Sequence, residues 1–147
     1  IANINNTLII DDYGHHPEEI KAVLSAAKLV EKNEKILAVF QPHRYSRLKN
    51  LFQEFCASFN DADKVILLNV YPAGEQKIIN FENLDLEVGI RNFGHKNVLS
   101  LKNDEHIYNI IKEDLKFFDI IIFLGAGSIS QIAHQITEKI LKIKEKN

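Results

Sequence analysis

Phe40-Gln41-Pro42-His43-Arg44-Tyr45-Ser46-Arg47 joins an apolar run to a segment in which apolar residues recur with helical spacing. Residues 34–40 are typical of a short strand, and Pro42 ends that strand because proline has no N–H to donate to a sheet. The apolar positions after the turn predict one helix: Leu48, Leu51, Phe52, Phe55 and Phe59. We expect Ser46 to be its N-cap. The stretch is therefore interpreted as a turn from a strand into a helix.

This turn carries one imidazole, two guanidiniums and a phenol within five residues, His43 to Arg47. Arg44 and Arg47 are three residues apart, so a first helical turn would project them in nearly the same direction. The unpaired N–H groups of a helix N-terminus favour anions, and a guanidinium can grip a carboxylate or phosphate with two hydrogen bonds. In an open α/β sheet, ligands bind at the carboxyl ends of strands. The turn predicts an anion site, against the alternative of two surface arginines paired with neighbouring acids.

With 46% hydrophobic and 26% charged residues, the composition is that of an ordinary soluble globular domain. We expect residues 1–147 to form a single domain. The net charge of −2 argues against a general electrostatic hold on nucleic acid or on an anionic membrane. The single cysteine, Cys56, permits no internal disulfide, favours a reducing compartment and is expected to be a packed thiol. Because the chain contains no methionine, even at its start, we expect it to be excised from a longer protein.

Strand-like and helix-like segments alternate along the chain. Five strands are expected, at residues 7–11, 34–40, 64–70, 97–101 and 119–124. Residues 81–93 fit a helix or a strand, and we favour a helix; another helix is expected to be capped by Asp104. This alternation predicts an α/β fold: a Rossmann-like, doubly wound, mainly parallel sheet of five or six strands, flanked by helices.

Polar residues also gather after the first expected strand, in Asp11-Asp12-Tyr13-Gly14-His15-His16-Pro17. A helix is expected to begin at Pro17, a favoured first helical position. The carboxylates and imidazoles before it can bind a metal, a ribose or a substrate; alternatively, the carboxylates only end a strand and His16 fills a cap position. We favour a functional role, but not a metal, because adjacent histidines point in different directions and no third ligand has a useful spacing.

Two further turns invite comparison with known sites. Residues 125–130 read G-x-G-x-x-S, an imperfect dinucleotide fingerprint that follows the last strand rather than the first, so close packing of strand and helix is favoured. The loop Tyr71-Pro72-Ala73-Gly74-Glu75 can supply Glu75 to a site or be an ordinary turn, and the sequence favours neither.

Taken together, residues 11–19, 40–47 and 71–75, with Gly125-Ala126-Gly127 near the end, resemble the C-terminal domain of the Mur ligase family, in particular its alanine-adding branch. The resemblance covers essentially the whole chain. Related muropeptide ligases share a similar opening Asp-Tyr-Ala-His motif but are not expected to carry Gln-Pro-His-Arg-Tyr.

The resemblance implies a cytoplasmic step of peptidoglycan synthesis. The family's enzyme joins L-alanine to the lactyl carboxylate of UDP-N-acetylmuramate through an acyl phosphate, with conversion of ATP to ADP and phosphate. An N-terminal domain binding UDP and a central domain holding most of the ATP and Mg²⁺ sites belong to the same longer chain. The isolated C-terminal domain is therefore expected to be inactive, without a metal ligand of its own.

Roles for individual residues come from the same resemblance. Asp12 is expected near the ATP ribose, and Tyr13 and His15 near the alanyl end of the substrate.

His43, Arg44 and Arg47 are expected to be catalytic, holding the amino-acid carboxylate and the charge that develops on the acyl phosphate. Ser128 stands where an aspartate is usual, which leaves any role of that acid open. Two alternatives also remain: a sister ligase that adds another amino acid or a peptide, and a non-catalytic domain that binds an anion.

Overall fold

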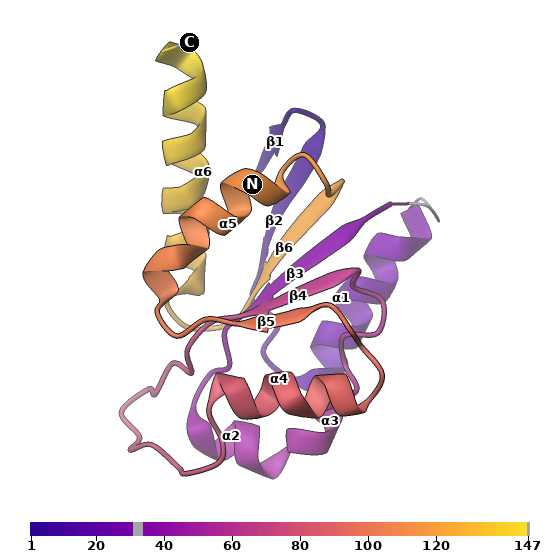
Figure 1. Ribbon diagram of the computed structural model, residues 1–147, viewed down its shortest axis with the longest axis vertical. Helices are drawn as coiled ribbons and strands as arrows, with labels where there is room; N and C mark the ends of the chain where they lie inside the picture. The colour runs from indigo at the N-terminus through magenta and orange to yellow at the C-terminus, as the bar shows by residue number, and fades with distance from the viewer. Residues whose placement is uncertain (31–33, 147) are drawn as a thin grey trace.

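A six-stranded sheet forms the centre of the computed structural model, which describes residues 1–30 and 34–146 (Figure 1). Its strand order is β1-β2-β6-β3-β4-β5. The strands are β1 (Ala2–Ile4), β2 (Thr7–Asp12), β3 (Ile36–Phe40), β4 (Lys64–Leu67), β5 (Val98–Ser100) and β6 (Ile120–Leu124). Neighbouring strands are parallel, except that β1 runs antiparallel to β2.

Helices cover both faces of the sheet, so the expected doubly wound, mainly parallel α/β fold is confirmed. One face is covered by α1 (Pro17–Val30), α2 (Tyr45–Asn50), α3 (Phe52–Cys56) and α4 (Asn83–Asn92). The other is covered by α5 (Ile107–Asp114), which follows the short 3-10 helix η1 (Asp104–His106), and by α6 (Ile129–Lys146). None of the described helices is both long and apolar enough to cross a membrane.

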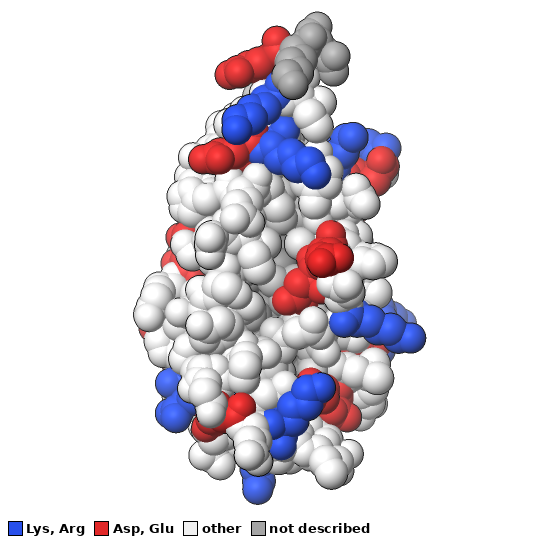
Figure 2. Space-filling model, turned by 90° about the vertical axis from the view of Figure 1, so that its left-hand side faces the viewer, with Lys and Arg blue, Asp and Glu red and all other residues white. Residues whose placement is uncertain are grey.

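The two central strands are apolar throughout because both of their faces are buried. All five residues of β3 and all five of β6 are buried. In β3, Ala38 and Phe40 pack beneath α1 to α4, while Leu37 and Val39 pack beneath α5 and α6. On the side formed by α5 and α6, basic and acidic side chains are interspersed over a largely uncharged surface (Figure 2).

Several expected element boundaries are confirmed and others are wrong. A helix begins at Pro17, and residues 81–93 contain α4, as favoured. The single helix expected after the central turn is broken at Leu51 into α2 and α3. Asp104 does not cap a helix: the Asn103 side chain accepts the Glu105 N–H instead, and the Asp104 carboxylate accepts the N–H of Asn69.

Ser46 is not the N-cap of α2, which is a second correction at the central turn. Arg44 holds that position with φ 67° and ψ 145°, and its side chain makes no cap hydrogen bond. Ser46 lies inside the first turn of α2, where its own N–H and hydroxyl donate to Glu75. The carboxylate of Glu75, from a loop distant in sequence, therefore accepts an N–H of the first helical turn, which a serine side chain was expected to do.

Strand β1 was not among the five strands located from the sequence. It pairs with β2 through a two-residue turn, in which Asn5 and Asn6 have φ of 51° and 70°. Positive φ at both positions is the requirement of a tight hairpin turn, and asparagine tolerates it better than most residues. The Asn-Asn pair was therefore a local signal that the sequence analysis missed.

Cys56 is buried where α3 packs on α4, which confirms the expectation of a packed thiol. Burial raises the pKa of the Cys56 thiol to about 11, so the thiol stays protonated at neutral pH. Gly89 of α4 faces it. A Cβ at Gly89 would overlap the Cys56 sulfur and lie 3.1 Å from Cε2 of Phe52.

We predict that Gly89→Ala destabilises the fold by about 1–3 kcal/mol, the usual range for overpacking, although alanine has the higher helix propensity. Urea unfolding measures the change. Adding Cys56→Ala should recover part of the loss, because it removes the sulfur with which the new methyl group collides. An unchanged free energy of unfolding for the single variant would show that α3 and α4 are not packed as described.

Candidate functional site

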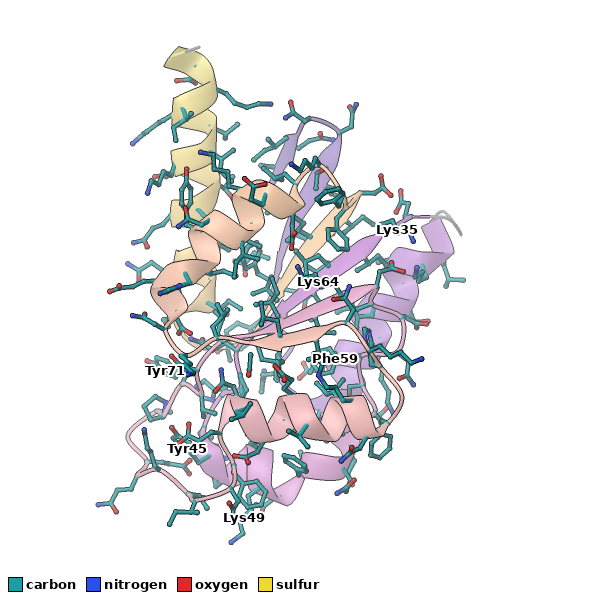
Figure 3. All side chains as sticks on the ribbon, viewed as in Figure 1. Lys35, Tyr45, Lys49, Phe59, Lys64 and Tyr71 are labelled. Carbon is teal, nitrogen blue, oxygen red and sulfur yellow. The ribbon has the colours of Figure 1, made fainter. Side chains whose placement is uncertain are left out.

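The turns after β2, β6 and β3 meet at one edge of the sheet because these strands are neighbours and end in register. Leu124 of β6 pairs with Asp12 on one side and with Phe40 on the other. The chain leaves β2 and β3 toward helices on one face and leaves β6 toward α6 on the other face. This divergence is the arrangement at which open α/β sheets bind ligands. Figure 3 shows Tyr45 and Tyr71 at this end of the molecule and Lys35 at the opposite end.

Four rings follow one another across this edge. The rings of Tyr13 and His15 have centroids 5.5 Å apart, and those of His15 and His43 are 6.3 Å apart. His43 stacks on Tyr71 at 5.4 Å with an interplanar angle of 21°. Tyr13 is 70% exposed, whereas the two histidines are half-buried. The structure thus brings three of the expected site residues together and adds Tyr71, which the sequence analysis did not single out.

Arg47 lies against His43, with 3.5 Å between Nη1 of the arginine and Nδ1 of the histidine. Burial lowers the pKa of His43 below its ordinary value of 6.5, and the charge of Arg47, then His15 and Arg44, lower it further. The imidazole is therefore neutral at neutral pH. Among the described residues, no carboxylate lies within 4.0 Å of the half-buried Arg47 guanidinium. Its charge remains available to an incoming anion.

Arg44 points elsewhere, to a carboxylate of the same chain. Its Nη1 lies 3.9 Å from Oε2 of Glu75, and its side chain is 46% exposed. Glu75 also accepts the Ser46 N–H at 3.0 Å and the Ser46 hydroxyl at 2.5 Å. These bonds from Ser46, followed by the charge of Arg44, lower the pKa of Glu75. The two arginines therefore do not project together: for Arg44, pairing with a neighbouring acid is what the structure shows.

The backbone of the 71–75 loop holds the same turn. Tyr71 donates its N–H to the Pro42 carbonyl at 2.8 Å and accepts the Arg44 N–H at 2.7 Å. These bonds make an isolated parallel bridge between His43 and Tyr71. Arg44 is thereby fixed by its backbone in a conformation, with positive φ, that non-glycine residues seldom adopt.

The carboxylates of the first turn have separate tasks. Oδ1 of Asp12 accepts the Gly14 N–H at 2.8 Å, which shapes the turn that presents Tyr13 and His15. Asp11 is directed toward α6: it accepts the Ser130 hydroxyl and lies 3.6 Å from Nε2 of His134.

His16 fills a cap position, because its Nδ1 accepts the Glu18 N–H at 3.3 Å. The simpler interpretation is therefore correct for this histidine.

The turn after β6 is packed closely against the turn after β3. Gln41, 2% exposed, donates from Nε2 to the Ser128 hydroxyl at 3.0 Å and accepts the Ile129 N–H on Oε1 at 3.1 Å. A Cβ on Gly127 would lie 2.7 Å from that Oε1 and 2.7 Å from Cγ of Tyr71. Close packing, which the sequence favoured over dinucleotide binding, accounts for this glycine-rich turn.

Within residues 1–30 and 34–146, no three His, Cys, Asp or Glu side chains are grouped so that they could hold a metal ion. A cavity of about 690 Å³ lies at the opposite end of the sheet, bounded by Asn6, Lys35, Phe118 and Lys144, and is separate from the candidate site.

The fold defines a Rossmann-like α/β domain whose candidate site carries Arg44, Arg47 and His43 at one edge of the sheet. The chain belongs to the family of Mur ligase C-terminal domains: the family model described as "Mur ligase, glutamate ligase domain" matches residues 1–127. It is 46% identical over 136 residues to a UDP-N-acetylmuramate–L-alanine ligase of Bradyrhizobium sp. (strain ORS 278), over 92% of this chain and 29% of the relative. The corresponding ligase of Rhodospirillum centenum is 48% identical over 132 residues, 90% of this chain and 27% of the relative.

Solved structures agree with this assignment of the fold. The UDP-N-acetylmuramate–alanine ligase of Thermotoga maritima aligns with a TM-score of 0.70 and 27% identity, over 91% of this chain and 26% of that one. A murein peptide ligase of Psychrobacter arcticus has a TM-score of 0.72 at 20% identity, over 94% of this chain and 28% of that one, a likeness of fold alone. The chain thus spans less than a third of the length of these relatives.

We predict that His43 titrates below 6.5 in an NMR pH titration and that Arg47→Gln raises its midpoint only part of the way back, because burial is the larger cause. Since folding lowers the pKa of His43, its neutral form contributes stability above pH 6.5 that is lost as the pH falls. Lys49→Gln, an exposed change in α2, is the matched control and should leave the midpoint unchanged. If Arg47→Gln left the titration midpoint of His43 unchanged, the contact between Arg47 and His43 would be contradicted.

Proposed function

We propose that the chain is the C-terminal domain of a UDP-N-acetylmuramate–L-alanine ligase of cytoplasmic peptidoglycan synthesis. The complete enzyme joins L-alanine to the lactyl carboxylate of UDP-N-acetylmuramate and converts ATP to ADP and phosphate. The two relatives of this name described above are 46% and 48% identical over at least 90% of the chain. Because the chain spans less than a third of them, an N-terminal and a central domain are to be supplied by the same longer protein.

The observation that carries the proposal for this site is the half-buried Arg47 guanidinium: it lies beside a neutral His43 and has no carboxylate partner among the residues that the structure describes. A guanidinium binds a carboxylate with two parallel hydrogen bonds, and a free amino acid presents such a carboxylate. We place the carboxylate of alanine on Arg47 and His43. The rings of Tyr13 and His15 follow that of His43 across the edge of the sheet, and we place the alanyl end of the product beside them.

Arg44 is suited to a different anion. Its guanidinium is exposed, so a phosphate held by another domain can reach it. We assign to Arg44 the charge that develops on the acyl phosphate. We assign Asp12 to the ATP ribose: Oδ1 already accepts the Gly14 N–H, and we give the second carboxylate oxygen to a ribose hydroxyl.

The reaction proposed for the complete enzyme has two steps. The lactyl carboxylate takes the γ-phosphoryl group of ATP and becomes an acyl phosphate; the amine of alanine then attacks the acyl carbon. The C–O bond to phosphate breaks, phosphate leaves with the electron pair, and the amine loses a proton. A preorganised donor such as Arg44 can contribute about 3 kcal/mol to this transition state.

The test is phosphate release by the complete ligase, given ATP, Mg²⁺ and UDP-N-acetylmuramate, across a panel of amino acids. We expect release that depends on alanine and is far weaker with serine or glycine. Release with no single amino acid would refute the proposal in favour of a peptide-adding sister ligase or a non-catalytic anion-binding domain.

We predict that Arg47→Ala raises the KM for alanine and lowers kcat, because the carboxylate loses its main partner, and that Arg44→Ala acts mainly on kcat. Each loss of kcat should be about 10²–10³-fold if the guanidinium acts on developing charge. Arg47→Lys should recover little, since an ammonium cannot make the two parallel bonds. Lys49→Ala in the same helix is the control for a change of charge alone. Wild-type kinetics for Arg47→Ala would remove the carboxylate from this site.

A further inference from the structure

Glu75 belongs to a loop whose purpose the sequence left open, and its carboxylate lies within the candidate site. It is held at three points: by the N–H and the hydroxyl of Ser46 and by the guanidinium of Arg44. Its side chain is only 28% exposed although the residues around it in the loop are exposed. We propose that Glu75 is a positioning residue that orients Arg44 toward the reacting phosphate, an inference that rests on the function proposed above.

The anchor for this role is Ser46. With both carboxylate oxygens bonded to the Ser46 N–H and hydroxyl, at 3.0 and 2.5 Å, Glu75 has little freedom to follow Arg44. Arg44, by contrast, has a long side chain that is 46% exposed and forms an ion pair with Glu75 at 3.9 Å. The carboxylate is therefore the fixed partner of the pair and the guanidinium is the partner whose direction is set.

The loop also holds Arg44 at its other end. The Arg44 N–H donates to the Tyr71 carbonyl at 2.7 Å, four residues before Glu75 in the chain. Tyr71 and Glu75 together restrain the backbone and the guanidinium of one residue. A loop that only connected β4 to α4 would need neither contact.

The presence of two positive charges on one short turn gives a physical reason for a carboxylate beside Arg44. Arg44 and Arg47 are both cationic, and His43 beside them is kept neutral. The carboxylate draws Arg44 away from Arg47, which leaves Arg47 to the amino acid and Arg44 to the phosphate. Protein kinases use the same principle, in which a glutamate fixes the direction of a phosphate-binding lysine.

The decisive variant is Glu75→Gln in the complete ligase. The amide oxygen can still accept the Ser46 N–H, but the negative charge beside Arg44 is lost. We expect kcat to fall about tenfold, as for loss of one charged hydrogen bond, with the KM for alanine within about twofold of wild type. The melting temperature should stay close to that of wild type, which separates positioning from a loss of structure.

A double-mutant cycle tests whether Glu75 acts through Arg44. In an Arg44→Ala background, Glu75→Gln should cause no further loss of kcat. Lys77→Gln, a change of one charge at an exposed position of the same loop, is the matched control and should leave kcat unchanged. An equal loss in both backgrounds, or a kcat that rises because Glu75 competes with the phosphate, would overturn the inference.

Failure of the inference is distinguishable from failure of the proposed function. If the wild-type ligase releases no phosphate with alanine, the function is wrong and the kinetic cycle does not apply. The orientation is then judged from the Arg44 Nε–H signal in NMR spectra of the chain. Glu75→Gln should shift that signal and increase its mobility, while Lys77→Gln should not; an unmoved signal would overturn the inference by itself.

Discussion

The insertion of β6 between β2 and β3 is the constraint on which the rest of the structure depends. The pairing continues past the strand ends: Gln41 donates its N–H to the Leu124 carbonyl, and Gly125 donates to the Asp12 carbonyl. These bonds align the ends of three strands whose turns are far apart in sequence. Because the strands are parallel, all three turns emerge at one edge, and their polar side chains meet there.

The buried amide of Gln41 then fixes how close two of those turns come. It satisfies the Ile129 N–H at the start of α6 and the Ser128 hydroxyl, both of which would otherwise be left poorly solvated beneath Tyr71. A buried donor without a partner costs about 1–3 kcal/mol, so the amide favours this spacing over looser ones. Gly127 is required for the same reason, since no Cβ fits between Gln41 and Tyr71. Because Tyr71 belongs to this packing, it also fixes the position of His43, whose ring stacks on it.

Local signals predicted much of the fold and the turn between β3 and α2, while the features that were missed depend on long-range contacts. Pro17 begins a helix as expected because its fixed φ and missing N–H are local properties. The cap of α2 was mispredicted since Glu75 lies 29 residues from Ser46, and the Gln41–Ser128 bond spans 87 residues. The sequence did not reveal the break between α2 and α3 at Leu51, because the helical spacing of apolar residues continues through that position. The expectation that Arg44 and Arg47 project in the same direction missed their separate partners for the same reason: Glu75, which pairs with Arg44, is distant in sequence.

The openness of the site bears on when its charges act. A surface ion pair such as Arg44–Glu75 contributes little while water screens it. If another domain covers the edge, as the proposed ligase requires, the same charges enter a lower dielectric and each interaction strengthens several-fold. In the proposed ligase, Arg47 and the neutral His43 would then bind a carboxylate with no acid of the described residues in competition, and Arg44 would already be oriented by Glu75. The charge stabilisation thus becomes large only in the closed state, which couples closure over the substrates to the chemical step.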